Sequence, residues 1–219
     1  MPDESSRLKF VLVTLVLAVG ADTAAKVFGL GWAAAATITF SLNGAILAFV
    51  YLRHDKLMGQ LFVFGLVAGF AELVSDHYSV STIGTLVYDK GGSFIWTSPL
   101  YMPFAYVVVL VQLGYLAYWM TMKWGLGRAT ILSAVIGGIN VPLYEYLAKG
   151  AGYWYYKDCQ MIFGTVPYYI VGGEIVFVGV LPVMISLFAR SKWPAVVALG
   201  LLEGAVMFIG WSGTYLITG

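Results

Sequence analysis

Seven long apolar runs, separated by polar segments, dominate the hydropathy pattern of this chain. They span roughly Phe10–Ala25, Trp32–Leu52, Leu57–Leu73, Pro99–Met122, Ala129–Leu147, Val166–Ala189 and Trp193–Ile217. Most have the ~20 residues that a helix needs to cross the hydrocarbon core of a membrane. Because backbone polar groups in lipid must pair within the protein, helices are the expected structure. We therefore predict an all-α, polytopic membrane bundle of about seven transmembrane helices, forming a single domain over residues 1–219.

The composition supports this class of protein. Hydrophobic residues make up 60% of the 219 residues and charged residues only 11%, whereas soluble domains average about 25% charged residues. The membrane lipids are therefore expected partners. A net charge of +1 gives no indication of a nucleic-acid partner, and the single cysteine, Cys159, excludes an internal disulfide.

Basic residues predict the orientation of the chain in the membrane. In a seven-helix arrangement eight of them fall on the N-terminal side, namely Arg7, Lys9, Arg53, Lys56, Lys123, Arg128, Arg190 and Lys192. The other four, Lys26, Lys90, Lys149 and Lys157, fall on the opposite side. Cytoplasmic loops carry the excess of Lys and Arg, so we expect a cytoplasmic N-terminus and an external C-terminus. The expected location is a bacterial inner membrane.

Acidic residues lie within the predicted helices, where ionised groups cost free energy. Asp22, Glu72, Glu145 and Glu174 are expected at similar depth in the outer half of the bundle, and Glu203 nearer its middle. Carboxyl groups in such places are candidates for function, although each could simply hydrogen-bond a neighbouring helix. Asp22 is expected to pair with Lys26, one helical turn later.

Two long aromatic loops are expected to fold back over these acids. They connect the third helix to the fourth and the fifth to the sixth. Val87–Tyr101 aligns without gaps on Tyr155–Tyr169, which pairs Tyr88 with Tyr156 and Pro99 with Pro167. The match predicts an internal duplication with both copies in the same orientation. His77 is the one histidine near the acids, so no metal site is predicted.

Two stretches resemble known families of small membrane enzymes. RHDKLMGQLFVFGLVAGFAELVSDHY (Arg53–Tyr78) is similar to the third helix of the fungal integral-membrane meroterpenoid cyclases, in which a glutamate near the helix end is proposed as the acid. Glu72 holds that position. GYWYYKDCQMIFGTVPYYIVGGEIVF (Gly152–Phe177) resembles the motif of the lycopene cyclase domain family, with Glu174 as the counterpart of its acids, although the adjacent double acid of that family is absent. The resemblance implies a terpenoid or carotenoid cyclase.

This chemistry suits the residues of the chain. Protonation of an alkene or epoxide needs a neutral carboxylic acid, which an apolar site favours, and a second carboxylate can take the proton back. The candidate catalytic residues are Glu72, as proton donor, Glu174, Glu145 and Asp76. Aromatic faces stabilise the carbocation, and the candidate substrate-binding residues are Tyr78, Trp96, Tyr101, Trp154, Tyr156, Tyr168 and Tyr169. No cofactor is expected.

Three hypotheses about function follow from the sequence. The leading one is a cyclase or hydratase of a lipid-soluble isoprenoid substrate. The second is a carrier or channel for protons, ions or a small solute, which would also use intramembrane carboxyl groups. The third is a membrane subunit that binds a lipid or pigment without chemistry.

Overall fold

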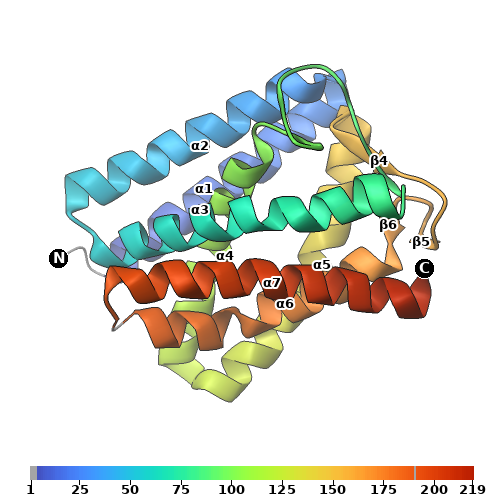
Figure 1. Cartoon of the computed structure of the whole chain (residues 1–219). Coiled ribbons are helices and arrows are strands. Elements are labelled where there is room, and N and C mark those ends of the chain that lie inside the picture. Colours follow the sequence, from blue (N-terminus) through green and yellow to red (C-terminus); the bar gives the residue numbers. More distant parts are fainter. Residues whose placement is uncertain (1–3, 190) are drawn as a thin grey trace.

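The computed structural model describes residues 4–189 and 191–219. Within these ranges seven helices are long and apolar enough to cross a membrane. They are α1 (Glu4–Phe28), α2 (Gly31–Arg53), α3 (Lys56–His77), α4 (Met102–Trp124), α5 (Leu126–Ala151), α6 (Tyr168–Phe188) and α7 (Trp193–Thr218) (Figure 1). The predicted membrane bundle of seven helices is therefore confirmed. One residue of the charge analysis, Arg190, lies outside the described residues.

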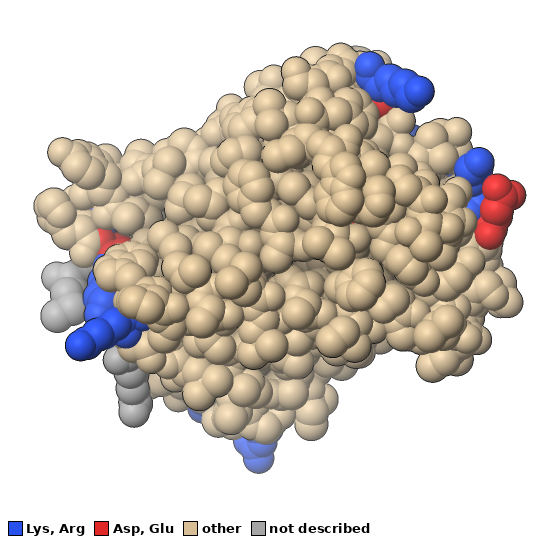
Figure 2. Space-filling view, in the orientation of Figure 1, with Lys and Arg blue, Asp and Glu red and all other residues tan. Residues whose placement is uncertain are grey.

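The two ends of the bundle differ. The N-terminus lies at one end, here called the N-terminal end. The C-terminus and the long connections after α3 and α5 lie at the opposite end, here called the loop end (Figure 1). Figure 2 shows one face of the molecule, which is broadly free of charged side chains and carries Lys, Arg, Asp and Glu only toward its margins. This distribution suits a protein surrounded by lipid, since charged side chains then stay near the helix ends.

Close packing unites five of the helices. The closest pairs are α5–α6, α6–α7, α3–α4 and α3–α7, so α7 packs against both α3 and α6. Small residues permit the close approach: a Cβ atom on Gly69 would lie 2.2 Å from the carbonyl oxygen of Pro103, and one on Gly137 would lie 2.7 Å from that of Glu174. In membranes such contacts between small residues replace the hydrophobic effect as the basis of helix association. Helices α1 and α2 pack less closely against this core.

Polar contacts join α1 to the start of α3 at the N-terminal end. Arg7 Nε donates to Asp55 Oδ2 at 2.6 Å, and Asp55 Oδ1 accepts from the backbone N–H groups of Leu57 and Met58 at 3.1 and 3.2 Å. Asp55 is thus both the N-cap of α3 and the partner of a cation on α1. The core next to it is apolar, and its fully buried side chains include Leu61, Phe64 and Phe188.

The two long connections have the same order of strands, and the first also begins with a π-helical turn. After α3 comes a π-helical turn (Tyr78–Thr82) and strands β1 (Leu86–Tyr88), β2 (Phe94–Ile95) and β3 (Ser98–Pro99); after α5 come β4 (Trp154–Tyr156), β5 (Met161–Ile162) and β6 (Val166–Pro167). β2 pairs with β3 and β5 with β6 as hairpins, while β1 pairs with β4 across the two connections. The equal order agrees with the predicted duplication.

The structure corrects one detail of the ungapped alignment. Two residues separate the paired positions Ile95 and Ser98 of the first hairpin, but three separate Ile162 and Val166 of the second. The match is therefore in register at both ends and shifted by one residue in between. Each hairpin has an aromatic residue with positive φ after its first strand, Trp96 at 55° and Phe163 at 51°. An ungapped comparison cannot detect that correspondence.

Candidate functional site

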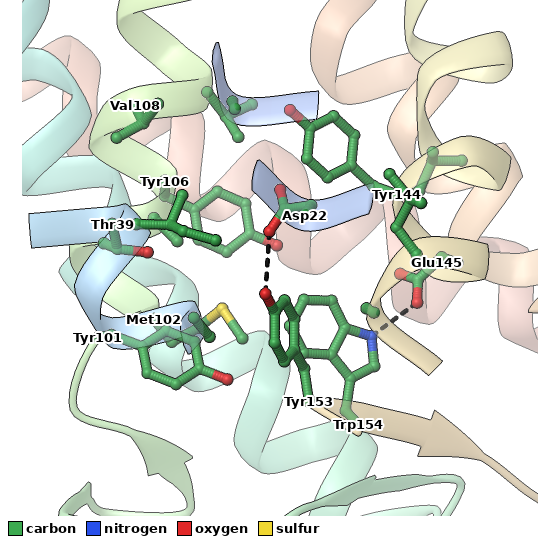
Figure 3. A pocket seen from close by; sticks show the side chains of 18 of the residues that line it. Asp22, Thr39, Tyr101, Met102, Tyr106, Val108, Tyr144, Glu145, Tyr153 and Trp154 are labelled. Carbon is green, nitrogen blue, oxygen red and sulfur yellow. Dashed lines mark hydrogen bonds between the residues drawn. The ribbon is translucent and has the colours of Figure 1, made fainter. Parts of the chain in front are cut away.

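A cavity of about 160 Å³ lies near the loop end of the bundle. Helices α1, α2, α4 and α5 form most of its wall, and β1 and β4 contribute its cover at the loop end (Figure 3). Its volume resembles that of engineered apolar cavities of about 150 Å³ that bind benzene. The space is therefore adequate for the reacting end of a lipid. The expectation that the long connections fold back over the acids is confirmed by Leu86, Tyr88 and Trp154, which all line the cavity.

Four carboxyl groups from four helices line this cavity. Asp22 comes from α1, Asp76 from α3, Glu145 from α5 and Glu174 from α6. All are buried, with exposed fractions between 1% and 8%. Three of the four candidate catalytic residues thus share one site. Glu72 is fully buried one helical turn before Asp76 but does not line the cavity, so proton donation from Glu72 to a molecule in the cavity would have to pass through another group.

Two of these acids accept hydrogen bonds from the loops in a matching way. Glu145 Oε2 accepts from Trp154 Nε1 at 2.6 Å and its Oε1 accepts from the Tyr156 hydroxyl at 3.1 Å. Asp76 Oδ2 accepts from the Tyr88 hydroxyl at 2.5 Å. Burial, followed by the charge of Asp76, raises the pKa of Tyr88 well above its ordinary value, so this hydroxyl remains a donor. Asp76, rather than Glu72, is therefore the counterpart of Glu145 in the other half.

Asp22 has a different partner from the one predicted. The Tyr153 hydroxyl donates to Asp22 Oδ1 at 3.1 Å (Figure 3), and Lys26 Nζ lies 3.3 Å from the centre of the Tyr146 ring. The predicted ion pair with Lys26 is therefore wrong. Helical spacing alone suggested it, but Asp22 is buried toward the cavity and is reached by the loop tyrosine.

The remaining acids lack such donors. Glu174 lines the cavity, and none of the described residues donates a hydrogen bond to its carboxyl group. Behind it, both carboxyl oxygens of Glu72 and of Glu203 are buried without a hydrogen-bond partner of good geometry among the described residues. Glu174 is close enough to Glu145, Glu72 and Glu203 to interact with each electrostatically. It therefore connects the cavity to a buried group of acids.

Three of the predicted aromatic residues, Tyr101, Trp154 and Tyr156, line the cavity. Tyr169 is fully buried just behind them, with its ring edge-on to Tyr156 at 6.4 Å and its hydroxyl 2.8 Å from Thr85 Oγ1. Tyr101, Trp154 and Tyr156 thus give the cavity aromatic lining, with Tyr169 behind Tyr156. They support a site that could face a cation with π-electrons.

The other predicted aromatic residues lie elsewhere. Tyr78 packs edge-on against Phe208 and Tyr215 of α7. Trp96 stacks on His77 at 4.0 Å and is 58% exposed, and Tyr168 is also exposed. The structure does not bring these three side chains into the cavity.

Several lining residues were not predicted from the sequence as site residues. They are Tyr88, Tyr106, Tyr144, Tyr153, Thr39, Gln112 and Asn140. The repeated motif contained Tyr88, and Gln112 is a lone amide within an apolar run, which is a usable signal in a membrane helix.

Within residues 4–189 and 191–219, no three His, Cys, Asp or Glu side chains are arranged to hold a metal ion.

Fold and site together define a polytopic membrane protein with a carboxyl-lined cavity beneath a cover of aromatic loops. The chain belongs to a protein family described as a domain of unknown function, DUF6989, whose model matches residues 73–218, about two thirds of the chain. The matched region begins at the end of α3 and includes Asp76, Glu145 and Glu174. No curated protein and no solved structure gives a significant match to the chain.

Proposed function

We propose that this protein is a membrane-embedded acid–base enzyme that cyclises or hydrates an isoprenoid lipid. The observation that carries the proposal is the convergence of four buried carboxyl groups on one aromatic-walled cavity. Carbocation chemistry needs an acid, a base, aromatic faces and little water. The resemblance of Arg53–Tyr78 to the helix of the meroterpenoid cyclases supports the same reaction class.

Hydrogen bonding divides the proposed roles between Glu174 and Glu145. A carboxyl group that receives a donor on each oxygen, as Glu145 does, has the partners of an ionised acceptor. Glu174 receives none from the described residues, which suits a group that acts as a proton donor. Glu174 is thus the proposed donor and Glu145 the proposed acceptor, with Asp76 and Tyr88 as the matching pair on the other side of the cavity.

The proposed reaction balances without a cofactor. The Glu174 O–H bond breaks as its proton forms a C–H bond with an alkene carbon, which leaves a carbocation and a Glu174 carboxylate. Attack by a second alkene closes a ring, and a neighbouring carbon then loses a proton to Glu145 and forms a double bond. Transfer of that proton from Glu145 to Glu174 restores the enzyme. In a hydratase, water would attack the cation instead, and its O–H bond would break as the proton passes to Glu145.

Product analysis tests the proposal. Purified protein in detergent should convert one member of a panel of polyprenyl alcohols, epoxides and carotenes into a product of equal mass, or of equal mass plus water. Glu174→Gln should lower turnover by at least about a hundredfold, the low end for acid–base catalysis, and so should Glu145→Gln. Asp158→Asn, in an exposed loop position, serves as the control. Normal turnover in Glu174→Gln would refute its role and direct attention to Glu72 and Asp76.

A carrier would need a path from the cavity to the N-terminal end. The bundle there is filled by Leu61, Phe64 and Phe188 and tied by Arg7 and Asp55, which favours an enzyme over a carrier. Proton or solute flux in liposomes without product formation would establish the carrier instead. A tightly bound lipid or pigment without flux or turnover would establish a binding subunit.

The proposed orientation follows from the charges. The excess of Lys and Arg at the N-terminal end supports a cytoplasmic position for that end, with the cavity on the side of the outer leaflet. The proposed location is a bacterial inner membrane, with isoprenoid and membrane lipids as the molecular partners.

A further inference from the structure

The cavity has a second polar layer below the carboxyl groups. Three uncharged polar side chains line it there, namely Thr39 on α2, Gln112 on α4 and Asn140 on α5. Asn140 precedes Glu145 by five residues on the same helix, which is roughly 7.5 Å along the axis toward the middle of the bundle. Apolar side chains such as Ile38, Val108 and Val141 complete the wall. Polar groups therefore occur at two depths of one largely apolar cavity.

In this deeper layer, Gln112 has a buried amide group that lacks a hydrogen-bond partner. The residue is 3% exposed, and its Nε2 atom is buried without a hydrogen-bond partner among the described residues. Because the amide carries both an acceptor and two donors, an unpartnered end remains whichever way it is turned. A buried amide that lacks a partner costs about 1–3 kcal/mol. Such a cost is characteristic of a group whose partner is a ligand.

Gln60 shows how the same residue type behaves in a structural role. It lies on α3 near the N-terminal end and is 1% exposed. Its Nε2 donates to the carbonyl oxygens of Phe188 and Ser191 at 3.4 and 3.2 Å, which ties α3 to the end of α6. Gln112 has no such contact with a neighbouring helix and instead lines the cavity.

We propose that Gln112, which lines the cavity together with Asn140 and Thr39, binds an oxygen function of the substrate. The substrate is accordingly an oxygenated isoprenoid, with a hydroxyl or carbonyl group several carbons from the carbon that is protonated, rather than a pure hydrocarbon. This inference rests on the proposed function, since it names the substrate class of the same cavity. A site built to hydrogen-bond a ligand rejects an analogue without that group, because its own polar atoms are then left unpaired.

Two ten-carbon probes test the inference, geraniol with a hydroxyl group and β-myrcene without one. Their binding to protein in detergent micelles can be followed through the fluorescence of Trp154 and Trp211, which both line the cavity. Comparing the ratio of the two affinities between wild type and variant cancels their different partitioning into the micelle. Gln112→Leu should lower the preference for geraniol at least about fivefold, and Gln112→Met provides a second apolar variant if the first does not fold.

Thermal unfolding distinguishes a ligand-binding role of Gln112 from a structural role. Gln112→Leu should melt at or above the wild-type temperature because it removes an unpaired buried amide. Gln60→Leu should melt lower and keep the wild-type preference. Equal preference in wild type and Gln112→Leu would overturn the inference, and so would a melting temperature for Gln112→Leu as low as that of Gln60→Leu. Preference for geraniol without turnover of any isoprenoid would overturn the proposed catalysis and leave this binding site standing.

Discussion

Replacing Tyr88 by Phe tests the hydrogen bond between the loops and the acids. The substitution removes one hydroxyl group, which donates to Asp76 Oδ2 at 2.5 Å, and leaves the ring in place. Tyr88 is 8% exposed and its partner 1% exposed. Removing the donor leaves a buried acceptor without its partner, which costs about 1–3 kcal/mol. We therefore expect Tyr88→Phe to lower the free energy of unfolding by about 2 kcal/mol.

Tyr101 provides a matched control within the same cavity. It also lines the site and is buried, but its hydroxyl has no hydrogen-bond partner among the described residues. Tyr101→Phe removes an unpaired polar atom and should leave stability unchanged or raise it slightly. Both variants can be compared with wild type by unfolding in mixed detergent micelles, followed by circular dichroism. Equal changes in the free energy of unfolding for the two substitutions would refute the assignment of the Asp76 contact. An unchanged free energy of unfolding in Tyr88→Phe would refute it as well.

Three further predictions concern the ends of the bundle. Asp55→Ala should destabilise the protein by about 2–4 kcal/mol, because it removes the N-cap of α3 and the buried partner of a cation on α1. Asp158→Ala removes one member of an exposed ion pair and should have no measurable effect on unfolding. Reporter fusions at Gly219 and after Met122 should report opposite sides of the membrane; the same side for both would contradict the seven-helix topology. Stability should be lost as the pH rises above about 10, the ordinary pKa of tyrosine, because the raised pKa of Tyr88 keeps its proton in the folded state while the unfolded chain loses it. A flat pH profile up to pH 12, or an unchanged profile in Tyr88→Phe, would count against that reasoning.

The hydropathy pattern predicted the helices well because lipid imposes a simple rule on them. Its errors lie at the ends. The first helix was predicted as Phe10–Ala25 but runs from Glu4 to Phe28, and the third was predicted to stop at Leu73 but continues to His77. Charged residues end an apolar run without ending a helix. Arg7 lies inside α1 because Asp55 satisfies it at the membrane boundary.

The site was only partly predictable, because side chains meet through tertiary contacts. The sequence placed Glu145 and Glu174 in one group of acids, and the structure brings both to the cavity. It could not decide which of two acids one turn apart, Glu72 or Asp76, faces that cavity. Nor could it show that Tyr153, from a distant loop, donates a hydrogen bond to Asp22 in place of an ion pair between Asp22 and Lys26. Those outcomes depend on contacts between distant parts of the chain, for which local patterns hold no information.

The pairing of β1 with β4 also bears on how such a chain could arise. Leu86 faces Tyr156, Val87 faces Tyr155 and Tyr88 faces Trp154. When each residue is replaced by its counterpart 68 positions away in the other half, this register maps onto itself. That is the self-complementary contact of a twofold dimer. Two copies of a single ancestral half would have joined through the same strand, so the present fold has the geometry of a dimer whose subunits became fused into one chain.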